Sequence, residues 1–224
     1  MTAPEIGAFW LHGTGVAGLH WSDRIAGSWP SLPGHARAPR ARAARVEAYA
    51  AALIPALPER FVIGGHSLGG MVAMQIAATL PDRCAGLVLV ETPLRLPRWI
   101  SRALGQRLSP LVSRVPGPEG LARLVARMCR NPSARDRLRQ AITATPQRGL
   151  MDAMRACLRF DGRTLLPQLT MPVLSLVGKH SILTGPEDRS AFARTRVYSA
   201  GHLLPFELPD VVADEINAFV EGLT

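Results

Sequence analysis

The chain has 224 residues, of which 47% are apolar, so it is long enough for one domain with a buried core and too apolar for a disordered chain. No stretch approaches the roughly 18 uninterrupted apolar residues of a membrane span, and residues 1–15 lack the pattern of a secretory signal. Cys84, Cys129 and Cys157 fit neither a zinc-binding spacing nor a disulfide framework, which favours a reduced, cytoplasmic protein.

The net charge of +9 is unevenly distributed along the chain. Residues 92–160 carry 14 arginines against three acidic residues, a net charge of +11, so the rest of the chain sums to −2. A basic surface of this kind attracts an acidic partner over about a Debye length. An ordinary solvated basic face would have the same composition, so the charge alone does not decide between the two.

Apolar runs and helical patterns alternate through the first 92 residues. In chain order we predict a buried strand at Ala8–Leu11, a short helix at Leu19–Ala26, a strand end with a turn at Trp29–Gly34, a helix at Arg40–Leu57, a strand at Arg60–Gly64, a buried helix at Leu68–Leu80 and a strand at Ala85–Val90. Strands that alternate with helices indicate an α/β fold with a mostly parallel sheet covered on both faces.

The pattern changes after residue 92. Residues 93–160 contain prolines and arginine-rich amphipathic stretches, with helices expected at Leu121–Arg130 and Ala134–Ile142 and no convincing strand. Further on we predict strands at Val173–Val177 and Arg196–Tyr198 and an amphipathic helix at Leu208–Leu223. The prediction is therefore a core of residues 1–92 and 161–224, interrupted by a helical, arginine-rich cap at residues 93–160.

The sharpest chemical signal is the pentapeptide Gly65-His66-Ser67-Leu68-Gly69, which follows an apolar strand and precedes a helix. A nucleophile on such a tight turn leaves little room for neighbouring side chains, so glycines flank it at both sides. The pentapeptide alone arises by chance in about one chain in ten. Its strand–turn–helix context therefore carries the prediction that Ser67 is a nucleophile and not an idle serine in a structural turn.

Two further segments fit around such a serine. His202, in Ala200-Gly201-His202, fits the chain order of serine, acid and histidine and would take the serine proton, although a structural role is the alternative for any single histidine. The N–H groups of Thr14, in His12-Gly13-Thr14-Gly15, and of Leu68 would form an oxyanion hole, unless the first segment is a plain glycine turn.

Together, the segments LHGTG, SLPGH, GHSLGG, VLSLVGKH and AGHLLPFE resemble the α/β-hydrolase superfamily from near residue 8 to the end. With its helical insertion the chain is similar to cytoplasmic carboxylesterases, including the pimeloyl-ACP methyl ester esterases of biotin synthesis. The resemblance implies the eight-stranded sheet of that superfamily. Because the chain starts at what would be the third strand, we expect a sheet shortened by its two N-terminal strands.

The identity of the catalytic acid is the main departure from the family. There the strand corresponding to VLSLVG is followed by Gly-x-x-Asp, but here Ser181 stands at the position of the aspartate. A serine cannot stabilise an imidazolium as a carboxylate does. Glu91 is the candidate for a relocated acid, since some relatives carry theirs at the end of the neighbouring strand. The alternatives are a slow enzyme with a dyad and a purely structural Glu91.

The predicted reaction is hydrolysis of an acyl ester through an acyl-enzyme on Ser67. The resemblance favours the methyl ester of an acyl chain on an acyl carrier protein, whose acidity would suit the basic cap. The cap arginines expected to contact this partner are Arg95, Arg98, Arg102, Arg123, Arg127 and Arg130.

Two alternatives stay open. The first is a small-ester, lactone or thioester hydrolase without a protein partner, and the second is a non-catalytic member of the fold that binds a ligand. No motif for a metal, a cofactor or nucleic acid is found in the sequence, and the sequence gives no oligomeric state.

Overall fold

The computed structural model describes residues 6–107 and 118–223. Within these residues, five strands form one parallel sheet in the order β1-β2-β3-β4-β5. The strands are β1 (Gly7–Leu11), β2 (Phe61–His66), β3 (Cys84–Val90), β4 (Val173–Gly178) and β5 (Arg194–Tyr198). Because all five are parallel, their carboxyl ends meet at one edge of the sheet, where α/β proteins place their ligands.

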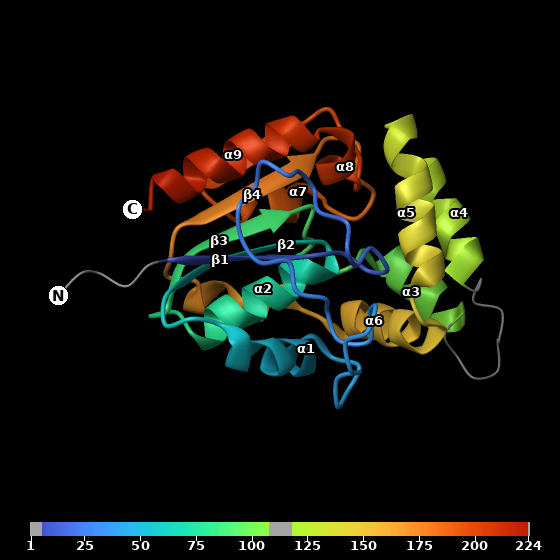
Figure 1. Cartoon of the computed structure of the whole chain (residues 1–224), viewed down its shortest axis with the longest axis horizontal. Coiled ribbons are helices and arrows are strands. Elements are labelled where there is room, and N and C mark those ends of the chain that lie inside the picture. The colour runs from blue at the N-terminus through green and yellow to red at the C-terminus, as the bar shows by residue number, and fades with distance from the viewer. Residues whose placement is uncertain (1–5, 108–117, 224) are drawn as a thin grey trace.

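Helices cover both faces of the sheet (Figure 1). One face carries α1 (Val46–Leu53), extended by the 3₁₀ turn η1 (Ile54–Ala56), and α2 (Leu68–Thr79), whereas α9 (Pro209–Glu221) covers the other. Shorter elements are η2 (Gly162–Gln168), α7 (Pro186–Ser190) and α8 (Leu204–Glu207). No helix in the described ranges is both long and apolar enough to cross a membrane.

In the described residues, four α-helices lie between β3 and β4. They are α3 (Arg98–Arg107), α4 (Pro118–Met128), α5 (Pro132–Ala144) and α6 (Gln147–Arg159), and Figure 1 shows them beside the carboxyl ends of the strands. Leu138 and Ile142 of α5 join the hydrophobic cluster on the α9 face, and Ala153 and Ala156 of α6 join the cluster on the α2 face. These helices therefore pack against both cores, and a cap domain bounded at residues 93 and 160 stays a prediction.

The central strands and α2 have the sequence that their position requires. Every residue of β2 is buried, which explains its continuous apolar run where an exposed face would require alternation. Leu68 to Met74 of α2 are buried on every side of the helix, so α2 is apolar all round. The helix ends at Thr79, just before Pro81, which cannot continue a helix.

The structure contradicts the helix predicted at residues 19–26 and the strand end predicted from residue 29, whereas the predicted turn is present at residues 33–34. Residues 19–26, where a helix is predicted, form turns, because Trp21 is buried against Trp10 and Trp29 instead of following a helical face. No residue of Trp29–Gly34 is in a strand, and the only pairing nearby in the described chain is a single bridge between Phe9 and Ser28. The two prolines of that segment lack the N–H groups that a strand needs for pairing. The described sheet consequently has five strands, where the superfamily pattern without two strands predicts six.

Three helices differ from the prediction: α1 begins later than expected, and α3 and α6 were not expected at all. The helix predicted to begin at Arg40 begins at Val46. Arg40 lies before the helix, where its Nε donates a hydrogen bond of 2.8 Å to the Asp152 carboxylate of α6. Helices α3 and α6 were not predicted, while α4 and α5 coincide with the two helices expected in the cap. The five strands and the helices α2 and α9 agree with the predicted ones to within a few residues, whereas α8 and η2 were not predicted.

Candidate active site

Three predicted residues come together at the carboxyl edge of the sheet. Ser67 directly follows β2, Glu91 directly follows β3, and His202 lies in the loop after β5. Positions far apart in the sequence thus meet because parallel strands end at the same edge.

Ser67 occupies a strained turn. Its φ of 53° and ψ of −116° belong to a conformation that residues with side chains rarely adopt. A Cβ added to Gly65 would lie 2.1 Å from the carbonyl carbon of Gly69, and one added to Gly69 would lie 2.1 Å from the Leu11 oxygen. Only glycines fit at these two positions. The turn therefore holds the serine at the strand–helix junction, as expected of a nucleophile elbow.

His202 links the serine to a carboxylate. Its Nε2 lies 3.0 Å from Oγ of Ser67, and its Nδ1 lies 3.1 Å from Oε2 of Glu91. In the tautomer with the proton on Nδ1, the serine hydroxyl donates to Nε2 and the Nδ1–H donates to the carboxylate. The His202 side chain is 10% exposed and that of Glu91 is fully buried, so most of this hydrogen-bonded line is shielded from solvent.

Glu91 is fully buried and its carboxylate is well supplied with donors. It accepts hydrogen bonds from the Gly178 N–H and from the Thr184 hydroxyl, at 3.1 Å for the latter, besides the contact with His202. Its φ of 48° is again in the left-handed region. A buried carboxylate is costly unless it is hydrogen-bonded, and a strained backbone persists only where its surroundings hold it. Both features aim Glu91 at the imidazole.

Ser181 has a different environment from the one that a catalytic acid needs. Its Oγ accepts hydrogen bonds from the N–H groups of Leu183 and Thr184, each at 3.3 Å, so the hydroxyl closes a local turn. That turn carries Thr184, which donates to Glu91. Sequence reasoning did not identify Thr184, because nothing in the local pattern distinguishes it from an ordinary loop threonine.

The two N–H groups predicted for an oxyanion hole lie on neighbouring elements. Leu68 is the first residue of α2, where N–H groups lack intrahelical partners and the helix dipole favours negative charge. Thr14 lies in a turn closed by a 3.3 Å hydrogen bond from the Val16 N–H to the Gly13 carbonyl. The close approach of Gly69 to Leu11 joins the start of α2 to the strand before this turn. The oxyanion hole itself stays a prediction.

Buried histidines support these loops, which the sequence did not reveal. His66 donates from Nε2 to the carbonyl oxygen of His202 at 2.8 Å, while its Nδ1 has no partner within the described part of the chain. His12 accepts from the Leu32 N–H at 2.9 Å through Nε2. Burial lowers the pKa of both His12 and His66 to about 3, so both rings stay neutral near pH 7.

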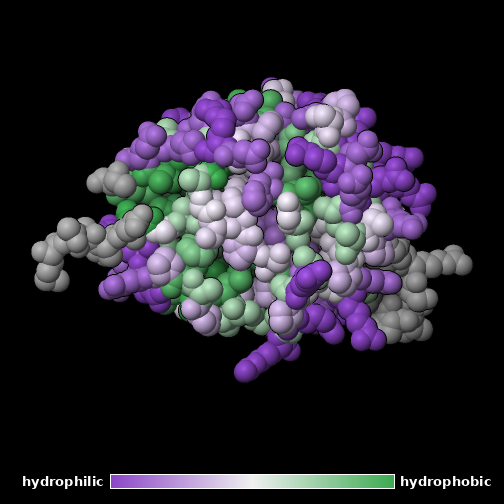
Figure 2. Space-filling model, viewed as in Figure 1, coloured by the Kyte–Doolittle hydropathy of each residue, from purple (hydrophilic) through white to green (hydrophobic). Residues whose placement is uncertain are grey.

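The arginines predicted to contact a partner lie on the helices at this end of the molecule. Arg98 and Arg102 are exposed on α3, and Arg123, Arg127 and Arg130 are exposed on or just after α4, whereas Arg95 is half-buried. Figure 2 shows a hydrophilic surface where α5 lies in Figure 1.

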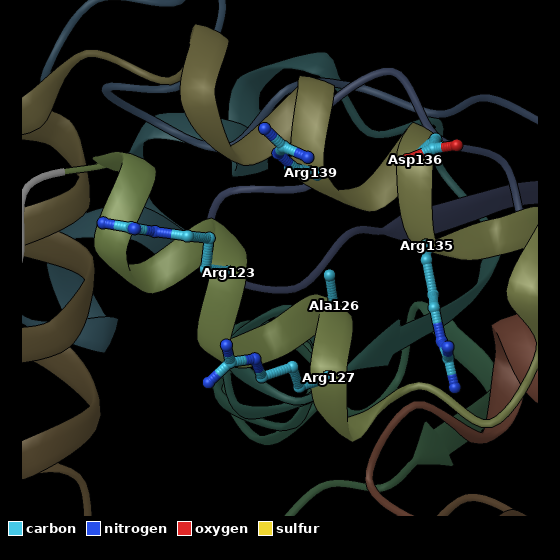
Figure 3. A pocket seen from close by; sticks show the side chains of 6 residues that line it. All are labelled: Arg123, Ala126, Arg127, Arg135, Asp136 and Arg139. Atoms are coloured by element: carbon cyan, nitrogen blue, oxygen red, sulfur yellow. The ribbon is translucent and has the colours of Figure 1, made fainter.

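Between α4 and α5 lies a pocket of about 240 Å³ (Figure 3). Its lining residues are Arg123, Ala126, Arg127, Arg135, Asp136 and Arg139. The sequence analysis did not single out Arg135 and Arg139, because only the pairing of the two helices brings them beside the arginines of α4. We call the four arginines of this pocket the hairpin arginines.

The three cysteines are poor candidates for a nucleophile. Cys84, Cys129 and Cys157 are free and buried, and burial raises the pKa of Cys84 and Cys157 to about 12. Thiols with such pKa values are not nucleophilic near neutral pH. No group of three His, Cys, Asp or Glu side chains in these ranges could hold a metal ion.

A parallel sheet with serine, histidine and a carboxylate aligned at its carboxyl edge is the arrangement of α/β-hydrolases. The sequence agrees with this class, since the model of the alpha/beta hydrolase family matches residues 8–215. The chain therefore belongs to the alpha/beta hydrolase family.

Several relatives by sequence are pimeloyl-[acyl-carrier protein] methyl ester esterases. The chain is 39% identical over 119 residues to a pimeloyl-[acyl-carrier protein] methyl ester esterase of Aromatoleum aromaticum, a match that covers 50% of this chain and only 43% of that relative. It is 30% identical over 209 residues to the enzyme of that name from Neisseria meningitidis serogroup C, with 79% of this chain and 75% of the relative covered. These relatives support an ester-hydrolysing enzyme.

Solved structures show the same fold. A thermophilic esterase from Thermogutta terrifontis superposes with a TM-score of 0.82 at 26% identity, over 99% of this chain and 92% of that one. The enol-lactonase from Burkholderia xenovorans LB400 gives a TM-score of 0.79 at 19% identity, over 97% and 92% of the two chains, which supports the fold alone.

Proposed function

We propose that this protein is a serine carboxylesterase with Ser67 as nucleophile, His202 as base and Glu91 as acid. The observation that carries the proposal is the unbroken hydrogen-bonded line from Ser67 through His202 to Glu91, with contacts of 3.0 and 3.1 Å. Both distances are within the range that proton transfer and imidazole orientation require. The presence of a buried carboxylate at His202 favours an enzyme over a non-catalytic binding protein.

Acylation begins when the ester carbonyl lies next to Oγ of Ser67. His202 Nε2 takes the hydroxyl proton while Oγ bonds to the carbonyl carbon, and the carbonyl oxygen becomes an oxyanion. The N–H groups of Thr14 and Leu68 donate to that oxyanion. The intermediate collapses when the C–O bond to the alcohol breaks, and the imidazolium returns its proton to the leaving alkoxide. The alcohol leaves and the acyl group stays on Ser67.

Deacylation repeats these steps with water. His202 takes a proton from a water molecule, whose oxygen attacks the acyl carbon, and the second oxyanion occupies the same site. The imidazolium then protonates Oγ as the bond between acyl group and serine breaks. The products are the carboxylic acid and free Ser67.

Glu91 acts through the imidazole in both half-reactions. It holds the Nδ1–H tautomer, which leaves Nε2 free to accept the serine proton, and its charge stabilises the imidazolium. The donors at Gly178 and Thr184 keep the buried carboxylate oriented. A glutamate at the end of β3 thereby takes the role that an aspartate after β4 has in the family pattern.

The substrate class that we propose is the methyl ester of an acyl chain on an acyl carrier protein. The names of the relatives support this choice, and so do the exposed arginines of α3 and α4 and the pocket of hairpin arginines. An acidic carrier protein would be attracted to this surface and would bring its acyl arm to the adjacent carboxyl edge of the sheet. The reaction would release methanol and leave the acyl acid on the carrier, in a cytoplasmic setting.

The test compares pimeloyl-ACP methyl ester with p-nitrophenyl butyrate, using the wild type and Ser67→Ala. We expect both substrates to be hydrolysed by the wild type, with kcat/KM for the carrier-bound ester falling steeply as salt is raised and that for the free ester barely changing. Equal salt responses with a slow carrier-bound reaction would favour the small-ester alternative. Undiminished hydrolysis by Ser67→Ala would overturn the mechanism.

A further inference from the structure

The end of α5 lies against the turn that carries Thr14. Thr145, the residue that follows α5, is 3% exposed, and its hydroxyl oxygen lies 3.1 Å from the carbonyl oxygen of Gly15. The same hydroxyl lies 3.0 Å from the Ala141 carbonyl one turn earlier in the helix, so it shares its proton between the helix and the loop. This contact joins residues 130 positions apart.

Gly15 is held at both of its backbone polar groups. Its N–H donates to Nε2 of His35 at 3.1 Å, and its carbonyl accepts from Thr145. Its φ of 78°, together with the Val16-to-Gly13 hydrogen bond, is typical of a type II turn with glycine at the third position. His35 therefore holds the peptide plane before Gly15, and Thr145 holds the plane after it. The Val16 N–H lies in that second plane and bonds the Gly13 carbonyl, whose peptide carries the Thr14 N–H.

Apolar contacts close the same place. A Cβ added to Gly15 would lie 3.3 Å from Ile142 and 3.4 Å from Leu150, so the end of α5 and the start of α6 already surround this residue. A Cβ added to Gly149 of α6 would lie 1.9 Å from the carbonyl oxygen of Gly34. The backbone of α6 therefore closely approaches the loop that contains Gly34. The turn that contains Thr14 is thus packed against cap helices as well as the sheet.

We propose that Thr145 is a positioning residue that holds the Thr14 N–H in place for the oxyanion. The inference rests on the proposed function, since it assigns a task to a cap side chain in that reaction. Donors of an oxyanion hole act only when they are preorganised, and small displacements of catalytic groups cost rate steeply. Without the Thr145 hydroxyl, the Gly15 carbonyl is a buried acceptor that has lost its donor. The peptide between Gly15 and Val16 can then rotate toward another donor.

Thr145→Val removes the hydroxyl at constant shape, and Thr145→Ser restores it. Thr143→Val is the matched control, because Thr143 is exposed on the same helix. We expect Thr145→Val to lower kcat for p-nitrophenyl butyrate about tenfold with KM unchanged. Its affinity for an alkyl trifluoromethyl ketone, which forms a tetrahedral oxyanion on the serine, should weaken by the same factor. Thr145→Ser and Thr143→Val should stay within twofold of the wild type on both measurements.

Thr145→Val values of kcat and ketone affinity within twofold of the wild type would overturn the inference, and so would a loss that Thr145→Ser fails to restore. Thr145→Ala removes the same hydroxyl and serves if the valine variant does not fold. The two proposals fail in distinguishable ways. If Ser67→Ala keeps full activity, the proposed function itself is wrong, whereas an inactive Ser67→Ala beside an unaffected Thr145→Val removes only the role of Thr145.

Discussion

Charged side chains have opposite environments at the carboxyl edge of the sheet and on the α4–α5 hairpin. At the sheet edge Glu91 is buried and meets donors from Gly178, Thr184 and His202. On the hairpin, Arg123, Arg127 and Arg139 are exposed and form no salt bridge within the described part of the chain. Chemistry at fixed geometry requires paired, buried groups, whereas recognition of a charged partner requires groups that are free to pair.

The two regions are nevertheless joined. Besides the contact of Thr145 with Gly15, the Glu207 carboxylate accepts from the Arg130 N–H at 3.1 Å and from the Gly201 N–H at 3.0 Å. The end of α5 therefore contacts the turn that carries Thr14, and the connection between α4 and α5 is linked to the loop of His202 through Glu207. The surface that we propose for partner recognition is thus in contact with the loops that carry the proposed catalytic residues.

The largest loss of activity should come from removing the buried charge of Glu91. Glu91→Gln replaces a carboxylate that accepts from Nδ1–H with an amide that can favour the wrong imidazole tautomer. We expect kcat to fall by about a hundredfold or more, as for a lost triad acid. The measurement is ester turnover of the folded variant, with Ser181→Ala as the control.

Ser181→Ala should stay within a few fold of the wild type, because Ser181 closes a turn and does not contact the imidazole. If Ser181→Ala lost more activity than Glu91→Gln, the acid would have been assigned to the wrong strand end.

Charge reversal on the α4–α5 hairpin should change KM for the carrier-bound ester and leave turnover of a free ester unchanged. Arg135→Glu combined with Arg139→Glu places two negative charges in the arginine pocket and should raise KM for the carrier-bound ester about tenfold at low salt. Turnover of p-nitrophenyl butyrate should be unchanged, because neither side chain touches the Ser67–His202–Glu91 line. Michaelis–Menten kinetics on both substrates check this.

Arg60→Glu is the control for the hairpin variant, since Arg60 is exposed next to the amino end of β2 and far along the strand from its carboxyl end. An equal rise in KM for Arg60→Glu would mean that net charge and not the hairpin attracts the carrier.

A smaller effect should appear in stability at acid pH. The folded pKa values of His12 and His66, about 3, lie below the ordinary value of 6.5 because both rings are buried. Only the unfolded chain then binds protons at these sites between pH 6.5 and 3, so stability falls as the pH falls through that window. Each ring should contribute a slope of up to about 1.4 kcal/mol per pH unit there.

The variant His66→Gln tests this slope, because a glutamine keeps a donor for the His202 carbonyl and has no titration. Urea unfolding from pH 7 to about pH 4.5 should give a flatter loss of stability for the variant than for the wild type. Parallel curves would mean that His66 is protonated in the folded protein.

Sequence reasoning predicted the sheet and the serine turn well because the responsible interactions are local. The apolar runs of β2 and β3 and the glycines around Ser67 follow from burial and from backbone space at those positions. By contrast, the turns at residues 19–26 depend on Trp21 meeting Trp10 and Trp29, a contact that no local pattern contains.

The supporting residues of the site were beyond sequence reasoning for the same reason. Thr184, His66 and Thr145 each act through a partner that lies 93, 136 or 130 positions away in the chain. Glu91 stayed one of several alternatives until the strand order placed β3 beside β4, with the Gly178 N–H within reach of its carboxylate.

The most direct test of the central claim is the intact mass of the protein after treatment with a fluorophosphonate. A serine hydroxyl reacts with this reagent when a base activates it, so the wild type should gain one adduct and Ser67→Ala none. That result would establish Ser67 as the activated nucleophile. An unmodified wild type, or an adduct that persists in Ser67→Ala, would contradict the account.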